Sequence, residues 1–527
     1  MILGHDKDFV YFRDSYRTAT KHGATYVKSR DAYKIPITLE GLDALVDEGY
    51  DTKPVDKLQQ SLLDYRFWAT RTKVTPTVVD KRLRGYQNID AEFLRSRNRA
   101  AVFNEQRTGK TPTTLIAARD KLGTGVIVCP AGLKLNWQRE IKIWLGKDAV
   151  VIKGTPTKRK RLYEAISQGS DGIIIVSYET LRTDLGTRFT PKNIDVLIVD
   201  EAHRLRNYKT KQSRALLTLS MMSETVYALT GTPAVNHPSD VYGILRLLRP
   251  TKYRSYWQFI ERYFGVMDGH FGKQILDLRD DRRSEFTYLL YDTSVNRKRR
   301  DIMKWIPKVT KRTIELDFDS KQHKHYKRVI KDLVYGLEGE EKSVPNALAQ
   351  LTRLRQICVD PALLELDGKS PKIEFIKEFI NDNTGSIIIF SSFTSFLNNL
   401  ADVVDDAVLL TGEQTQAEKQ RNIDRFQYKE VRVLLANIKA GGVGFTLDRA
   451  DTVIFADRSY NPVDNEQAAD RFIPTRKDVE YGAKQIIDLT MAGSVEVGIN
   501  KLLRDKQNII SYVNTYIDNL GVKLGIL

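Results

Sequence analysis

The stretch AAVFNEQRTGKTPTTLIAARDKL, residues 100–122, decides the fold. Its first residues are typical of the end of a buried strand, NEQRTGKT of a loop, and the remainder of a helix. Gly109 lets the backbone turn close to a phosphate, Lys110 can reach the outer phosphate oxygens, and the Thr111 hydroxyl can bind magnesium. The pattern predicts a phosphate-binding loop, although Asn104 stands where the usual pattern has its first glycine.

Short apolar runs with β-branched residues recur on both sides of a long charged and aromatic stretch. Because they alternate with helical patterns, they predict an α/β fold with two parallel sheets, one in each of two lobes. The runs are 126–130, 173–178 and 196–203 in the first lobe, and 387–393, 431–437 and 452–458 in the second.

The same pattern divides the chain into five parts. We expect a small α+β module at 1–75 with an amphipathic helix near 39–48, a first lobe at 76–250, and a second lobe at 371–490. Residues 251–370 are expected to form helical insertions and a linker without buried strands, and 491–527 a helical segment.

Two acids follow the apolar run that ends at Val199. Asp200 and Glu201 would lie at the carboxyl end of a parallel strand, where ligands bind in open α/β sheets. Asp200 is predicted to hold magnesium through water. Glu201 is predicted to orient and deprotonate an attacking water, since phosphoryl transfer depends on positioning and charge neutralisation.

Further motifs occur in a fixed order: LRGYQ at 83–87, VCPAGLKLNWQREI at 128–141, SYETLR at 177–182, DEAH at 200–203, LTGTP at 229–233 and KAGGVGFTL at 439–447. With the phosphate loop, this series resembles superfamily-two helicases, and more closely the Swi/Snf-type DNA translocases, from about residue 83 to 506. The resemblance implies two RecA-like lobes, the cofactors ATP and Mg²⁺, and ATP hydrolysis that drives movement along double-stranded DNA.

The resemblance also implies roles for individual residues. The nucleotide would contact Gln87, Arg107, Thr108, Gly109, Lys110, Thr111 and Gly442; magnesium would be held by Thr111 and Asp200; DNA would contact Pro130, Lys134, Thr230, Lys439, Gly441 and Arg299. Lys110, Asp200, Glu201 and an arginine finger would carry the catalysis.

The last motif departs from the family pattern. In EQAADRFIPTRK, residues 466–477, Ile473 and Pro474 stand where the family has a histidine and a second arginine. Pro474 cannot continue a regular helix, so a different local geometry is expected. Arg471 and Arg476 both remain candidates for the finger.

The N-terminal text FVYFRDSYRTATKHGATYVKSRDAYKIPIT, residues 9–38, resembles the HARP-like modules of annealing helicases. That resemblance implies recognition of branched DNA, such as forks and four-way junctions. The alternative is a packing module that only buttresses the first lobe.

Charge and cysteine content narrow the class of protein. The 527 residues carry a net charge of +16, which favours a polyanionic partner. The two cysteines lack the spacing of a metal cluster, and no signal peptide or apolar run of about 18 residues is present. We therefore expect a soluble monomer without a membrane partner, in the cytoplasm of a host cell if viral (possibly phage-encoded) or at the nucleoid if bacterial.

The preferred hypothesis is an ATP-dependent translocase that remodels duplex and branched DNA, by branch migration or fork regression, in replication, recombination or repair. One alternative is a conventional 3′–5′ DNA helicase or an RNA helicase. Another is a nucleic-acid-binding scaffold that does not hydrolyse ATP, which the presence of Lys110, Asp200 and Glu201 disfavours.

Overall fold

The computed structural model describes most of the chain between residues 76 and 503 and part of the N-terminal region. The described residues are 1–5, 9–15, 19, 24–36, 45, 50, 76–167, 172–191, 193–234, 237–269, 272–338, 344–441, 445–474, 479, 481–501 and 503. All of 504–527, and the helix expected near 39–48 except for Leu45, lie outside these residues.

Lobe 1 is built on a seven-stranded parallel sheet with the order β13-β5-β10-β9-β6-β8-β7. Its strands are β5 (Arg99–Val102), β6 (Gly125–Cys129), β7 (Ala149–Val151), β8 (Ile173–Ser177), β9 (Ile194–Asp200), β10 (Ser223–Leu229) and β13 (Ser294–Val295). Its helices are α4 (Gly85–Ser96), α5 (Lys110–Ala118), α6 (Lys134–Leu145), α7 (Pro156–Ser167), α8 (Tyr178–Asp184), α9 (Lys211–Met221), α10 (Tyr242–Leu248), α11 (Tyr256–Tyr263), α12 (Arg283–Thr293) and α13 (Arg299–Ile302).

Alternate side chains of the central strands supply two apolar layers, because successive residues of a strand point to opposite faces. On β9, Val196 and Ile198 pack with residues of α4, α5 and α6, whereas Leu197 and Val199 pack with residues of α8, α9 and α10. Both faces of the sheet are therefore covered, which explains the nearly continuous apolar text of these strands.

Lobe 2 repeats this architecture around a six-stranded parallel sheet with the order β14-β19-β18-β15-β17-β16. Its strands are β14 (Val309–Leu316), β15 (Ile387–Ser391), β16 (Ala407–Leu410), β17 (Val433–Asn437), β18 (Thr452–Phe455) and β19 (Lys484–Met491). Its helices are α14 (Ser320–Glu338), α15 (Val344–Val359), α16 (Pro371–Asp382), α17 (Thr394–Ala401), α18 (Gln416–Gln427), α19 (Ile438–Gly441) and α20 (Pro462–Asp470).

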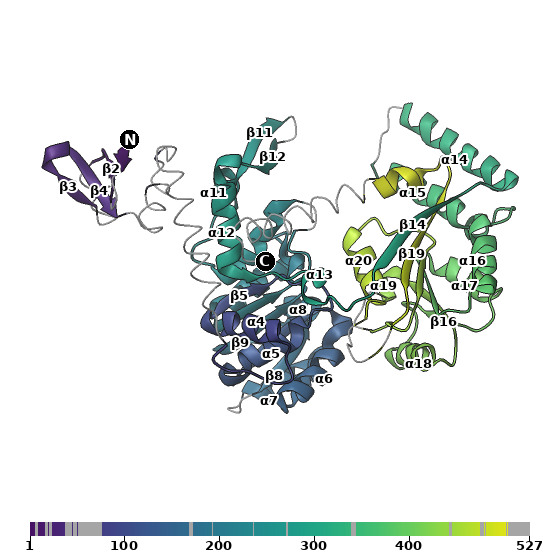
Figure 1. Ribbon diagram of the computed structural model, residues 1–527, viewed down its shortest axis with the longest axis horizontal. Coiled ribbons are helices and arrows are strands. Elements are labelled where there is room, and N and C mark those ends of the chain that lie inside the picture. The colour runs from purple at the N-terminus through teal and green to yellow at the C-terminus, as the bar shows by residue number, and fades with distance from the viewer. Residues whose placement is uncertain are drawn as a thin grey trace.

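Figure 1 shows the two lobes side by side, lobe 1 in blue and teal and lobe 2 in green and yellow. The α/β prediction with two RecA-like parallel-sheet lobes is confirmed, and each of the six apolar runs quoted above overlaps a strand.

The segment 251–370 differs from the expectation of helices without buried strands. It contains the antiparallel hairpin β11 (Phe264–Gly269) and β12 (Gly272–Leu278), the buried strand β13 at the edge of the lobe 1 sheet, and β14 at the edge of the lobe 2 sheet. The sequence TKRTIEL of β14 is mostly exposed, because an edge strand needs few apolar residues. Such a strand does not produce the apolar run by which strands were recognised.

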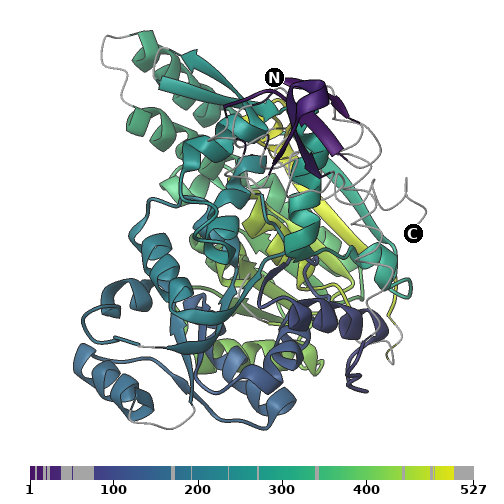
Figure 2. The same ribbon diagram turned by 90° about the vertical axis from the view of Figure 1, so that its left-hand side faces the viewer.

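The N-terminal region forms a separate four-stranded antiparallel sheet with the order β1-β2-β4-β3. Its strands are β1 (Ile2–His5), β2 (Phe9–Phe12), β3 (Thr25–Val27) and β4 (Ala32–Pro36). Val10, Phe12 and Ile35 are buried in a small core of its own. Figure 2 views the molecule from the side on which this sheet, in purple, lies.

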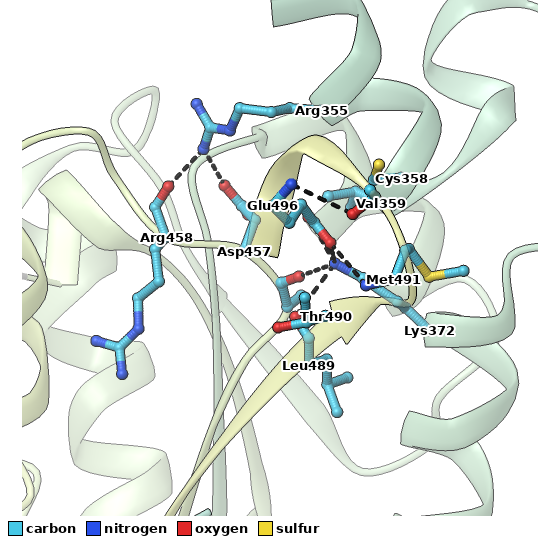
Figure 3. Close-up of polar contacts among 12 residues, drawn as sticks. Arg355, Cys358, Val359, Lys372, Asp457, Arg458, Leu489, Thr490, Met491 and Glu496 are labelled. Carbon is cyan, nitrogen blue, oxygen red and sulfur yellow. Dashed lines mark hydrogen bonds and ion pairs between the residues drawn. The ribbon is translucent and has the colours of Figure 1, made fainter. Parts of the chain in front are cut away.

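A buried polar network joins helices of lobe 2 to the carboxyl ends of its strands (Figure 3). The ammonium of Lys372, on α16, is fully buried and lies 2.8 Å from a carboxylate oxygen of Glu496. It also donates a hydrogen bond of 2.6 Å to the Ala456 carbonyl after β18. Arg355 of α15 pairs with Asp457 at 2.7 Å. A buried charge is tolerated only when paired and hydrogen-bonded, so these pairs fix both helices against the sheet.

Candidate active site

The loop between β5 and α5 has the conformation of a phosphate-binding loop. Gly109 has φ +80°, in the left-handed region that favours glycine, and α5 begins directly after it at Lys110. A Cβ atom at position 109 would lie 2.1 Å from Nε2 of Gln87. The Lys110 ammonium donates hydrogen bonds to the carbonyls of Asn104, at 2.9 Å, and Glu105, at 3.2 Å. A cation and the free N–H groups of a helix N-terminus thus meet at this loop.

Gln87, near the start of α4, packs against the same loop. Its Nε2 donates to the Thr108 carbonyl at 3.1 Å, and its Oε1 accepts a hydrogen bond from the Arg84 N–H at 2.7 Å. The Tyr86 hydroxyl also donates to the Thr108 carbonyl, at 2.7 Å. The side chain of Gln87 is buried, so here it supports the loop. Its contact with an adenine base stays a prediction.

Asp200 lies at the carboxyl end of β9 and is held from two directions. The indole N–H of Trp137 donates to one carboxylate oxygen and the Glu201 backbone N–H to the other, each at 2.9 Å. Burial and the neighbouring Glu201 carboxylate raise the pKa of Asp200 to about 6. The positive charge of Lys110 lowers the pKa of Asp200, so the phosphate loop and this carboxylate interact electrostatically.

Glu201 follows in a conformation that is rare for a residue with a side chain, with φ +54°. Its carboxylate lies 3.2 Å from Nδ1 of His203, which also lies 3.2 Å from the hydroxyl of Thr230. Burial would raise the pKa of Glu201, but the hydrogen bond with His203 and the charges of Lys110 and Arg471 outweigh it, so the pKa is lowered. Backbone strain of this kind persists where the surroundings hold it, and it is common at functional sites.

Arg471 approaches these acids from lobe 2. It follows α20, which ends at Asp470, so the helix stops before Pro474, as that proline predicts. Burial lowers the pKa of Arg471, and the carboxylates of Glu201, Asp470 and Asp200 oppose that shift. Glu201 and Arg471 line one cleft of about 470 Å³ between the lobes.

Two arginines bridge the lobes beside this cleft. Arg107, in the phosphate loop, donates hydrogen bonds to the carbonyls of Asp470, Arg471 and Phe445 and to the hydroxyl of Thr446. The Arg299 guanidinium donates to Asp470 at 2.6 Å and lies 3.4 Å from the Glu105 carboxylate.

Two of the predicted DNA contacts, Arg299 and Thr230, are engaged with protein groups in this structure. The Arg299 guanidinium pairs with carboxylates of both lobes, those of Glu105 and Asp470. Thr230 is fully buried, and its hydroxyl contacts His203 and the Thr232 N–H. The contact of either residue with DNA stays a prediction.

Of the other predicted DNA contacts, two line the cleft. Pro130 and the exposed Lys439 line it. Lys134, at the start of α6, donates to the Ile152 carbonyl at 3.0 Å. Gly441 ends α19. The predicted contacts of Gly442 and Arg476 fall outside the described residues.

Sequence reasoning missed His203 and Trp137 as parts of the site. The Trp137 side chain is 1% exposed. A buried indole needs an acceptor for its N–H, which was the available signal. Thr111, the second residue of α5, lies at the loop as predicted.

Comparison with known proteins agrees with this arrangement. The family described as SNF2-related domain matches residues 42–363, more than half of the chain, and the helicase conserved C-terminal domain matches 371–473. "Chromodomain-helicase-DNA-binding protein 1-like" of Mus musculus is 27% identical over 74% of this chain and 46% of its own length. An ATP-dependent helicase of Mycoplasma pneumoniae is 26% identical over 81% of this chain and 42% of its own length.

The chain thus spans less than half the length of these curated relatives. Among solved structures, the Sulfolobus solfataricus SWI2/SNF2 ATPase core in complex with dsDNA is similar, with a TM-score of 0.40 and 22% identity over 84% of this chain and 95% of that one. Within the described residues, no helix has the length and apolar character that crossing a membrane requires.

Proposed function

Because the chain belongs to the SNF2-related family of helicase-type ATPases, we propose that it hydrolyses ATP and uses the free energy to move along double-stranded DNA. One observation carries the proposal: charged side chains of both lobes lie close enough to shift one another's pKa. They are Lys110, Asp200 and Glu201 of lobe 1 and Arg471 of lobe 2, and Glu201 and Arg471 line the cleft between the lobes. Opening and closing of such a junction during the ATP cycle can move the lobes relative to each other.

The residues present fit a nucleotide with a divalent cation. The start of α5 and the Lys110 ammonium offer donors to phosphate oxygens, while the Thr111 hydroxyl and the Asp200 carboxylate are oxygen ligands of the kind that Mg²⁺ prefers. When bound, the cation would neutralise charge on the phosphates.

The chain's own residues would supply the remaining catalysis. The lowered pKa of Glu201 keeps its carboxylate ionised at neutral pH, as a group that orients a water and accepts its proton must be. Arg471 would stabilise the charge that develops on the transferred phosphoryl group. His203 contacts both Glu201 and Thr230, and so connects the site to the segment that follows β10.

DNA as the polyanion is supported by the net charge of +16 and by the names of relatives, one of which is called a DNA-binding helicase. Pro130, Lys439 and Gly441 are proposed to contact the duplex, since Pro130 and Lys439 line the cleft and Gly441 ends α19, the helix that carries Lys439. Lys134 is proposed as a further phosphate contact near the same edge.

ATP turnover should rise roughly tenfold or more with duplex DNA, because the two ligands are coupled through one lobe junction. We would measure phosphate release without nucleic acid and with single-stranded DNA, duplex DNA, duplex RNA and a four-way junction. Stronger stimulation by RNA would favour an RNA helicase, and efficient strand displacement on a forked substrate a conventional unwinding enzyme. Absence of turnover under all conditions would favour the alternative of a nucleic-acid-binding scaffold that does not hydrolyse ATP.

We further propose that the N-terminal sheet recognises branched DNA, so that the protein remodels forks and four-way junctions. Tyr26, Lys28 and Arg30 are exposed at β3 and the turn that follows it. Arg30 also stacks on the Tyr11 ring at 4.0 Å. An exposed aromatic beside exposed cations suits contacts to unpaired bases and phosphates at a branch.

The double variant Lys28→Gln with Arg30→Gln should weaken binding to a four-way junction more than to linear duplex, because the motor lobes keep their own phosphate contacts. The slope of log K against log salt should fall by about 1 to 2 for the junction alone. Fluorescence anisotropy with both labelled DNAs measures this. A matched variant in lobe 2, Arg421→Gln with Lys429→Gln, removes the same charges from an exposed surface. Unchanged junction preference in the N-terminal variant would favour the buttress alternative.

A further inference from the structure

Arg107 is an unusual residue for the centre of a phosphate loop. Its φ of +68° lies in the left-handed region, which disfavours any residue with a Cβ. Its guanidinium is directed away from the loop and across the lobe junction. Strain of this kind persists only where other contacts hold it, so the contacts made by this side chain are the place to look for its role.

Among the described residues, the Arg107 side chain makes four hydrogen bonds, all to lobe 2, and they end on two segments. Nε donates to the Asp470 carbonyl at 3.1 Å and Nη2 to the Arg471 carbonyl at 2.6 Å. Nη1 donates to the Thr446 hydroxyl at 2.9 Å and Nη2 also to the Phe445 carbonyl at 3.3 Å. The planar fork therefore holds the backbone at the predicted finger and at the segment beside it.

The two lobe 2 segments are already joined to each other. The Leu447 N–H donates to the Arg471 carbonyl at 2.9 Å, and the Arg471 guanidinium lies 3.5 Å from the Phe445 carbonyl. Arg107 thus binds two lobe 2 segments that are already hydrogen-bonded to each other. A second, independent bridge runs from Glu105 through Arg299 to the side chain of Asp470.

Burying the charged guanidinium of Arg107 beside a second arginine costs free energy, and the hydrogen bonds described above offset that cost. Burial and the neighbouring Arg471 lower the pKa of Arg107 to about 9, while Asp448 and Asp470 oppose the shift. Two guanidinium groups at close range repel each other, so the carbonyl acceptors must hold Arg107 in place.

We propose that Arg107 is a positioning residue: it ties the phosphate loop to the backbone of Asp470 and Arg471, and so sets where the Arg471 guanidinium lies relative to the nucleotide site. The proposal rests on the proposed ATPase function and replaces the expectation that Arg107 binds the nucleotide. When the lobes close, Arg471 is placed at the same time, because the Arg107 side chain extends from the phosphate loop of lobe 1 to the backbone of Arg471 in lobe 2.

Turnover by three variants tests this role. Arg107→Ala and Arg107→Gly should lower kcat about 10- to 100-fold while KM for ATP changes less than about threefold, since a displaced finger affects the transition state and not ground-state binding. Glycine relieves the backbone strain and alanine does not, so equal losses in the two variants assign the effect to the guanidinium. Arg107→Lys should recover little, because a point charge cannot replace four forked donors.

The double variant with Arg471→Ala separates positioning from other roles. If Arg107 acts through Arg471, then Arg107→Ala should cause no further loss in the Arg471→Ala background. Losses that multiply, or a raised KM with an unchanged kcat, would overturn the proposal and return Arg107 to nucleotide binding. Lys429→Ala is the matched control, because Lys429 is also a positive-φ residue, φ +69°, and lies exposed in lobe 2.

A second measurement does not depend on ATP hydrolysis. Spin labels on Met221→Cys in lobe 1 and Val403→Cys in lobe 2, both exposed positions, report the distance between the lobes in the full chain. Cys129 and Cys358 are buried, so labelling favours the introduced sites. Arg107→Ala should broaden or shift the distance distribution and Lys429→Ala should not. An unchanged distribution overturns the proposal, whereas missing turnover in the unmodified protein would count against the ATPase function alone.

Discussion

Replacing Lys110 with alanine should reduce ATP turnover to below about one thousandth of that of the unmodified protein, while most DNA binding is retained. The Lys110 ammonium is the cation of the phosphate loop, and it is close enough to Glu201 and Asp200 for all three charges to influence one another. Alanine removes this charge from the place where phosphate charge must be stabilised. It removes no group from the predicted DNA contacts. Phosphate release and filter binding with duplex DNA measure the two properties separately.

Lys121→Ala is a matched control for that change. Lys121 is also a lobe 1 lysine whose ammonium donates to a backbone carbonyl, that of Arg95 at 3.0 Å, but it lies on the far side of α5 from the loop. The Lys121→Ala variant should hydrolyse ATP at nearly the rate of the unmodified protein. Substantial turnover by Lys110→Ala would reject the phosphate loop as the nucleotide site, and loss of DNA binding would indicate that the fold is disturbed.

Replacing Arg471 with alanine should lower kcat by about 10³-fold with little change in nucleotide affinity, because an arginine finger contributes mainly to the transition state. Arg471 of lobe 2 lines the same cleft as Glu201 of lobe 1, where a finger would have to lie. Single-turnover hydrolysis and equilibrium binding of a nucleotide analogue measure the two effects. Arg425→Ala, at an exposed lobe 2 arginine paired with Glu430, is the control.

Arg476→Ala decides the alternative that the sequence left open. If this variant is the more damaging, the irregular motif around Pro474 has moved the finger to Arg476. If neither substitution reduces kcat by more than about tenfold, then no arginine of this motif acts as a finger. The first result would move the finger within the motif, and the second would remove it from the motif.

The part of the fold that could be predicted is the part with a strong local signal. Buried strands such as β9 and β15 are apolar on both faces, so a run of β-branched residues identifies them from neighbouring residues alone. The edge strands β13 and β14 lack that signal and were missed. They depend on a partner strand far away in the chain, β5 for one and β19 for the other.

The sequence by itself determined the phosphate loop, the acids after β9 and the presence of two parallel-sheet lobes, because each rests on residues within a few positions of one another. Only the tertiary structure decided which side chains meet. Arg107 and Arg471 are 364 residues apart, and Thr230 is 27 residues from His203. A hydrogen bond forms within about 3.5 Å, and the folding of both lobes sets that distance; no local pattern encodes it. For that reason the sequence alone did not show that Arg299 pairs with carboxylates of both lobes, or that Thr230 is buried against His203.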